Sequence, residues 1–478
     1  MVIMPYTFLS FLSYLIYFPM AQESFKVVEV CNIEPFHEPT KPSQSPTTLP
    51  LTFFDLLWLR FPPVERLFFY EFTNSTNIFY ETFLPNLKHS LSLTLQHFLP
   101  FAGNIVWPIG SSKPIINYVP GDFVSFTVVE SNSSFKDLSS NHCDASKRHH
   151  LIPLLNTSHE KASLVSFQVT LFQNNGFCIG ITTHHAGFDG KSSTNFMKLW
   201  SYIARSNSNL GSSFLSLPEN LTPFFDRSLI EDHYNGISEA YANTLMKHGG
   251  PNNKSLEVWD SLGRSKNDAV KRLFELTPSN IQKLKEYAKN EMKINVVNLS
   301  TFSVTCAYVL SCLVEAEQPK DEKVIFIFSV DCRTRLDPPI SSMYIGNCIA
   351  GQKVELKPKK FVGKAGFLSA LEGMNEGLNM VKNDGVLNGV ENWLDNMLNA
   401  KEKIKIYSLA GSPRFEVYST DFGFGKPKKV DTTSTDKTGA FSLSESRNNV
   451  GGVEIGLALN KQEMEVFSTL FVQGLESI

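Results

Sequence analysis

The chain has 478 residues, too many for a single hydrophobic core of ordinary size, so its length predicts two or three domains. Hydrophobic residues make up 42% and aromatic residues 12% of the chain, which excludes a largely disordered protein. The formal net charge is −3 and no long basic stripe occurs, so we expect no nucleic-acid partner.

The cysteines indicate a reducing compartment. Seven are scattered along the chain and none forms a C-x-x-C pair. An odd number without paired spacing favours free thiols over disulfides, and it gives no zinc-binding pattern. We therefore expect a cytoplasmic protein that has no metal site.

The first 19 residues are apolar and uncharged. A signal peptide normally begins with basic residues, and a spanning helix needs about 20 apolar residues, whereas this stretch is short and contains Pro5. We expect translation to start at Met20, with residues 1–19 outside the fold. If the leader is retained, a membrane-anchored or secreted protein is the alternative.

The first half of the chain alternates predicted strands and helices. Apolar periodicity and turn residues define four of them. They are a strand over 25–33, a helix that begins near Phe83 and stops at Pro100 and Gly103, and a hairpin of strands 164–172 and 176–185.

A helix follows over 191–206, with Phe196, Trp200 and Ile203 as its apolar stripe and Ser192 or Ser193 as its N-cap. Residues 206–265 are rich in Ser, Asn, Gly and Pro, which predicts a crossover linker. We expect an N-terminal domain over 20–205 and a C-terminal domain over 266–478.

The second half has a similar order of elements. A helix begins after Thr277, with Pro278 at its first position. The other predicted elements are strands over 270–276, 323–333, 415–425, 438–446 and 451–460 and helices over 298–316 and 461–477.

The stretch THHAGFDG places His185 and Asp189 four residues apart, after an apolar strand. An imidazole with a pKa near 6.5 is suited to accepting a proton from an alcohol. Asp189 either orients the ring or stabilises the turn through an ion pair, and we favour the ion pair. A purely structural histidine is the alternative. A metal ion would need a third ligand, and His149 and His150 lie beside Lys147 and Arg148, which repel cations.

A second stretch, DFGFG at 421–425, is followed by Lys426, Lys428 and Lys429. The glycines permit a sharp turn. The lysines contact phosphates or belong to a solvated loop. A kinase is excluded because its glycine-rich and catalytic loops are absent, and the lack of G-x-S-x-G gives no support for a serine hydrolase.

The two motifs, in this order and with these flanks, make the chain resemble the plant BAHD acyltransferases, which carry HxxxD in mid-chain and DFGWG near the C-terminus. Here Phe424 replaces the usual Trp. The resemblance runs from about Met20 to the end and includes LSLTLQHFLPFAGN, VDCRTRLDPP and SLSES. YIGNC, at 344–348, is similar to the YFGNC signature of the branch that acylates phenolic and flavonoid glucosides.

The resemblance implies an α/β fold: two chloramphenicol-acetyltransferase-like domains of mixed sheet and helices with a channel between them. A segment near 420–444 is expected to be exchanged into the N-terminal domain. By the same resemblance His185 is the general base and Asp189 is a structural carboxylate paired with Arg333. Asp421 shapes its loop, away from the base.

The resemblance further implies a monomeric O-acyltransferase without a bound cofactor, in which acyl-CoA is the co-substrate and the acceptor is a small-molecule glucoside. Malonyl-CoA is the expected donor, with hydroxycinnamoyl- or acetyl-CoA as the alternative. Lys191 and Arg335 are candidates for pairing the malonyl carboxylate, with surface charge as the other interpretation. Ser300 and Lys426 are candidate CoA contacts. A catalytically silent binding protein of the same fold is the alternative from another class.

Overall fold

The computed structural model describes most of the chain. The described residues are 25–37, 47–207, 217–233, 236–259, 269–292, 299–320, 323–357, 363–399 and 404–478. The expectations for the leader 1–19 and for parts of the segment 206–265 therefore lie outside the described residues.

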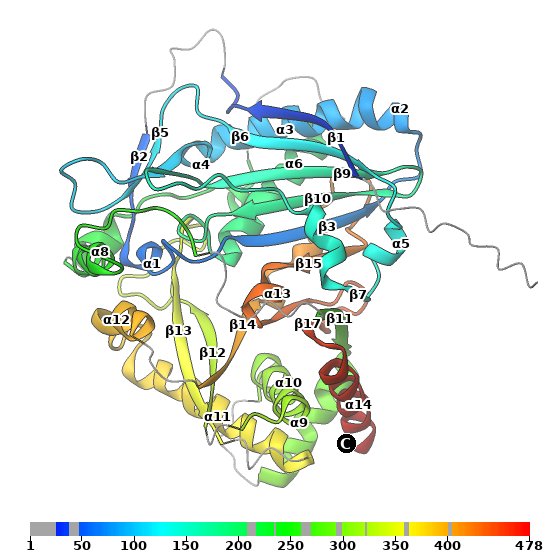
Figure 1. Ribbon diagram of the computed structural model, residues 1–478. Coiled ribbons are helices and arrows are strands. Elements are labelled where there is room, and N and C mark those ends of the chain that lie inside the picture. Colours follow the sequence, from blue (N-terminus) through cyan, green and yellow to red (C-terminus); the bar gives the residue numbers. More distant parts are fainter. Residues whose placement is uncertain are drawn as a thin grey trace, which may run out of the picture.

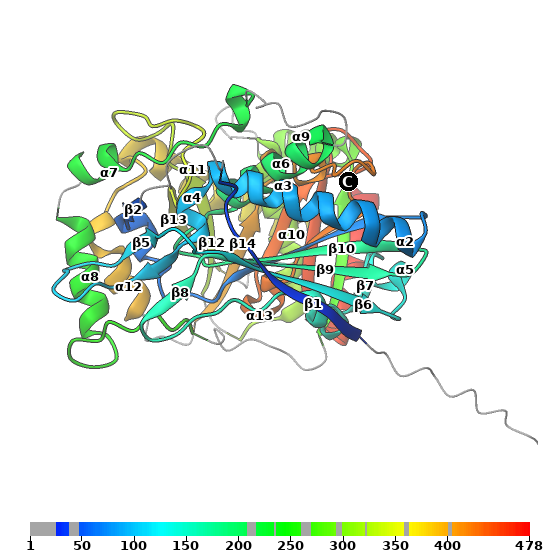
Figure 2. The same ribbon diagram turned by 90° about the horizontal axis from the view of Figure 1, so that it is seen from above.

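A six-stranded mixed sheet organises the N-terminal half (Figure 1). Its order is β1 (Phe25–Ile33), β6 (Val124–Ser131), β9 (Val165–Phe172), β10 (Gly176–Thr183), β3 (Val64–Glu71) and β15 (Lys429–Thr432). Only β6 and β9 run parallel. Helices α3 (Leu84–His97) and α6 (Gly190–Asn207) cover one face, and Figure 2 shows α3 crossing over the strands.

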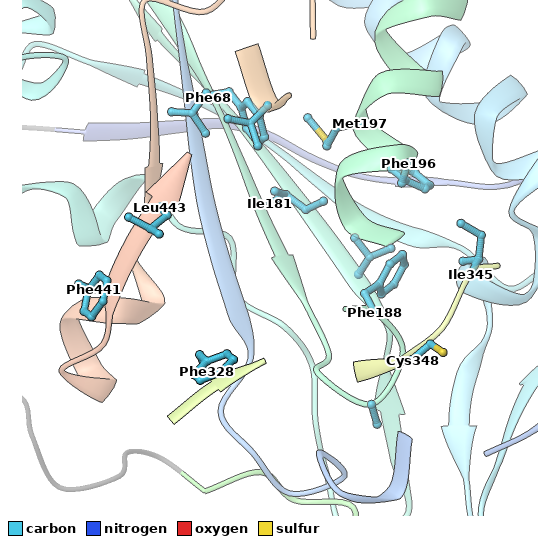
Figure 3. Close-up of a cluster of buried hydrophobic side chains, with 14 of the residues drawn as sticks. Phe68, Ile181, Phe188, Phe196, Met197, Phe328, Ile345, Cys348, Phe441 and Leu443 are labelled. Atoms are coloured by element: carbon cyan, nitrogen blue, oxygen red, sulfur yellow. The ribbon is translucent and has the colours of Figure 1, made fainter. Parts of the chain in front are cut away.

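A seven-stranded mixed sheet organises the C-terminal half. Its order is β13 (Ile349–Leu356), β12 (Val324–Asp331), β14 (Lys405–Gly411), β16 (Phe441–Glu445), β17 (Val453–Asn460), β11 (Ala269–Leu276) and β7 (His142–Asp144). Four helices lie on the side away from the first sheet (Figure 1): α9 (Pro278–Met292), α10 (Thr301–Glu317), α11 (Gly363–Asp384) and α14 (Lys461–Ser477). Hydrophobic side chains of both sheets belong to one core cluster (Figure 3).

Smaller elements flank the two sheets. A four-stranded sheet has the order β2 (Thr47–Pro50), β5 (Ile115–Tyr118), β4 (Asn104–Val106) and β8 (Lys161–Ser163). The short helices include α1 (Phe53–Leu56), α2 (Thr76–Ile78), α4 (Leu99–Ala102), α5 (Phe135–Leu138), α7 (Ser228–His233), α8 (Ile237–Lys247), α12 (Trp393–Leu398) and α13 (Ser434–Thr438). Among the described residues, no helix combines the length and apolar composition that crossing a membrane requires.

The two halves exchange strands. β15 comes late in the chain yet pairs with β3 of the first sheet, and β7 comes early yet pairs with β11 of the second. Buried charges accompany this exchange: Arg148 Nη1 lies 2.6 Å from Asp431 Oδ2, and Lys271 Nζ lies 3.3 Å from Asp431 Oδ1. Because these side chains are almost fully buried, each charge depends on its partner.

Most predicted helices and strands are confirmed, but two local predictions are wrong. Residues 415–425 do not form a strand: 3₁₀ turns at Pro413–Phe415 and Val417–Ser419 lead into an irregular loop. Positive φ angles at Glu416, Gly423 and Gly425 prevent an extended strand. The N-cap prediction also fails, because α6 begins at Gly190 and the Asp189 carboxylate accepts the Ser192 backbone N–H at 2.8 Å.

Candidate active site

His185 lies in the turn between β10 and α6, two residues beyond the end of the strand. Its imidazole stacks on the indole of Trp58, with centroids 4.1 Å apart and planes 7° apart. The ring of Phe61 meets the imidazole edge-on at 6.4 Å. Two aromatic side chains from the segment before β3 thus fix the plane of a half-buried histidine.

The environment of His185 keeps its ring neutral. Burial lowers the pKa of His185 to about 4, and its own backbone carbonyl and Asp189 act in the opposite direction without restoring the usual value. At neutral pH the imidazole is therefore unprotonated and able to accept a proton. His184 is more deeply buried, and burial, together with His185, lowers its pKa to about 3.

Asp189 is not a free carboxylate, because it forms a buried ion pair with Arg333. Its Oδ2 lies 2.8 Å from Arg333 Nη2, and both side chains are almost fully buried. Arg333 also donates to the carbonyls of Tyr344 and Gly346 and to Asp331 Oδ1. Burial alone would lower the pKa of Arg333, but the two carboxylates hold it above its usual value.

A hydrogen-bond chain that was not predicted from the sequence supports the His185 turn. Asn347 Nδ2 donates to the His185 carbonyl at 2.8 Å and to Asp55 Oδ1 at 3.1 Å. Asp55 is fully buried and also pairs with Arg227. Asn347 belongs to YIGNC, which was used only to assign a branch, so the signal was present in the sequence. Figure 3 shows Cys348 of this stretch near Phe188 of the turn.

The two candidate carboxylate-binding cations lie together at Asp331. Lys191 Nζ is 3.3 Å from Asp331 Oδ2, and Arg335 Nη1 donates to the Asp331 carbonyl at 2.7 Å. The Lys191 side chain is partly exposed and Arg335 is exposed, so both cations face solvent at least in part. Their role in binding an acyl carboxylate stays a prediction.

The DFGFG loop packs against the N-terminal half. Asp421 Oδ1 accepts the backbone N–H groups of Gly423 and Gly425 at 2.8 and 2.9 Å, which closes the loop. Phe422 meets Tyr70 and Trp200 edge-on. Phe424 packs on Phe177 of β10, on Phe72 just after β3 and on Phe83 just before α3. These contacts make the loop a packing element.

The candidate CoA contacts lie on separate elements. Ser300 is the N-cap of α10, where its hydroxyl accepts the Ser303 backbone N–H at 3.0 Å. Lys426 is exposed at the end of the DFGFG loop. Among the described residues, no group of three or more His, Cys, Asp or Glu is placed to hold a metal ion, and all seven cysteines are free thiols.

The protein has an α/β fold of two mixed sheets that exchange strands. A neutral histidine lies in the turn before α6, as expected of an acyltransferase that resembles this class. The pattern of the Transferase family matches residues 34–473, and the chain belongs to this family, the BAHD acyltransferases. It is therefore an acyl-CoA-dependent acyltransferase, as expected.

Curated relatives are similar over nearly the whole chain. Phenolic glucoside malonyltransferase 1 of Arabidopsis thaliana is 38% identical, covering 95% of this chain and 99% of the relative. Malonyl-CoA:anthocyanidin 5-O-glucoside-6''-O-malonyltransferase of the same organism is 37% identical, covering 94% and 98%. The crystal structure of vinorine synthase matches with a TM-score of 0.68 at 19% identity, covering 94% of this chain and 98% of that one, which confirms the predicted fold class.

Proposed function

We propose that the protein transfers a malonyl group from malonyl-CoA to a sugar hydroxyl, the 6-position being the expected one, of a phenolic or flavonoid glucoside. His185 is the general base in this proposal. The observation that carries it is the half-buried, neutral imidazole held flat against Trp58, at the position of the HxxxD motif. The two malonyltransferase relatives support the choice of donor and acceptor.

The reaction needs no covalent enzyme intermediate. A ring nitrogen of His185 takes the proton of the acceptor hydroxyl as its oxygen attacks the thioester carbonyl. The tetrahedral intermediate then collapses, the carbon–sulfur bond breaks, and the leaving CoA thiolate recovers the proton from the imidazolium. The products are the sugar ester and CoA, and His185 returns to its neutral form.

Asp189 and Arg333 are positioning residues in this proposal. Their ion pair anchors the first turn of α6 to the loop between β12 and β13, which sets the direction of the His185 turn. Asp421 shapes its loop, Ser300 and Lys426 contact CoA, and no bound cofactor is required. We also propose that the enzyme acts as a cytoplasmic monomer.

The test is a matrix of donors and acceptors read by product mass. Malonyl-, acetyl- and p-coumaroyl-CoA are each incubated with a set of phenolic and flavonoid glucosides. Efficient malonylation supports the proposal. Exclusive use of p-coumaroyl-CoA would show that malonyl-CoA is not the donor. Failure of every donor would favour a silent binding protein.

Two variants test the base. His185→Ala is expected to lower kcat by about 10²–10⁴-fold, the usual contribution of a general base. His159→Ala is the matched control, because the His159 side chain is exposed. Equal turnover by His185→Ala and the wild type would remove the base assignment.

A further inference from the structure

Arg66 is a buried cation that the mechanism above does not use. It lies on β3 and is 6% exposed. Its Nη1 donates to the Thr194 hydroxyl at 2.8 Å, a neutral partner. Within the described ranges its guanidinium forms no ion pair. Glu445 acts on it through space only, and Oε1 of that carboxylate accepts the Tyr418 backbone N–H at 2.7 Å.

Arg66 lines a small cavity between the two sheets. Arg66 and Thr432 come from the first sheet, and Ser442 and Ser444 come from β16 of the second, with Phe415 beside them. The cavity has a volume of about 20 Å³. Since one water needs roughly 10–15 Å³ by the same measure, this space admits a small polar group and excludes an aromatic ring.

The cavity lies beside the motif that carries His185. Thr194, the partner of Arg66, is in the first turns of α6, and a Cβ at Gly190 would lie only 2.6 Å from the ring of Phe415. On the sheet, Arg66 pairs with Ile181, four residues before His185. Four residues span at most about 14 Å when fully extended, a distance that an arginine side chain, a short acyl group and an imidazole can bridge together.

We infer that Arg66 binds the free carboxylate of the malonyl donor while the thioester carbonyl lies at His185. This inference rests on the proposed function and names the residue that selects its donor. A buried cation without a carboxylate in direct contact is costly, and a carboxylate offers the planar pair of acceptors that a guanidinium fits. Lys191, by contrast, already has a carboxylate partner in Asp331.

Donor preference is the direct test. For wild type, Arg66→Met and Arg66→Lys, kcat/KM is measured with malonyl-CoA and with acetyl-CoA, which has the same thioester and no carboxylate. Because Arg66→Met removes the buried charge that pairs with the malonyl carboxylate, we expect it to lower the malonyl-to-acetyl ratio of kcat/KM about 30-fold or more. The kcat/KM for acetyl-CoA should stay nearly unchanged. Arg66→Lys keeps the charge and is expected to retain part of the preference.

Lys198→Met is the matched control, because it removes a cation of α6 that already pairs with Glu416 at 2.9 Å. Its ratio should equal that of wild type. If Arg66→Met does not fold, Thr194→Val carries the test, since it removes the hydroxyl that orients the guanidinium and should reduce the same ratio.

The outcomes separate the two proposals. An unchanged ratio in Arg66→Met, an equal fall with both donors, or a ratio that shifts only in Lys191→Met or Arg335→Met would overturn the role of Arg66 and leave malonyl transfer standing. Wild-type enzyme that turns over neither donor would instead overturn the proposed function, and this is measured before any variant.

Discussion

The buried ion pair between Asp189 and Arg333 allows the role of Asp189 to be measured. Replacing Asp189 by Asn keeps the shape of the side chain and an oxygen for the Ser192 N–H, but it removes the charge that faces Arg333. Breaking one partner of a buried pair typically costs 3–5 kcal/mol, because the other charge stays buried.

For Asp189→Asn we expect a cost near the lower end of this range of free energies. Arg333 has a second carboxylate, Asp331, whose Oδ1 lies 3.0 Å from Nη1. The Asp331 side chain is 41% exposed, so solvent screens it and it replaces only part of the lost interaction. We expect Asp189→Asn to lower the free energy of unfolding by about 3 kcal/mol.

The assay is urea denaturation followed by fluorescence, with kcat measured on the same samples. Asp331→Asn is the matched control: it removes the exposed carboxylate from the same guanidinium and should cost at most about 1 kcal/mol. Loss of stability with a modest fall in kcat supports a positioning role. A fall in kcat of about 10³-fold or more at unchanged stability would show that Asp189 orients the base, and the reasoning would be wrong.

Four further predictions follow from the same contacts. Because burial lowers the pKa of His185 to about 4, kcat/KM should stay flat as the pH falls towards 5 and drop only near 4; an acid limb near 6.5 would contradict this. With His184 lowered to about 3, the unfolded chain binds more protons below pH 6.5, so a urea midpoint series should show stability falling between pH 6.5 and 3. Trp58→Leu should lower kcat by roughly 3–30-fold, since the indole face stabilises the imidazolium that forms, and Trp58→Phe should restore part of it in steady-state assays. Because Phe422 is buried against Tyr70 and Trp200, Phe422→Ala should lower the free energy of unfolding by about 3–5 kcal/mol, measured by urea denaturation. The KM for both substrates should stay unchanged.

The sequence predicted the elements whose own periodicity is strong. α6 and β10 were found because their apolar residues repeat at helical or strand spacing, and this spacing is what buries them. The segment 415–425 misled the same reasoning. Phe422 is buried by contact with Tyr70 of β3 and Trp200 of α6, while Glu416, Gly423 and Gly425 turn the backbone away from a strand. Apolar residues in a short segment indicate burial, and a loop can bury them as well as a strand.

The candidate site shows a similar division. The sequence alone shows a histidine and an aspartate four residues apart. Their hydrogen-bond partners are remote in the sequence: Arg333 is 144 positions from Asp189, and Asn347 is 162 positions from His185. The stack on Trp58 and the buried position of Arg66 likewise depend on how β3 enters the sheet. Local sequence therefore identifies the histidine that we propose as the base, and the packing of the two sheets sets its protonation and orientation and the position of Arg66, the group that we propose binds the donor carboxylate. If that is so, a change at Arg66 alters which acyl group is transferred, and a change at His185 alters whether any is transferred.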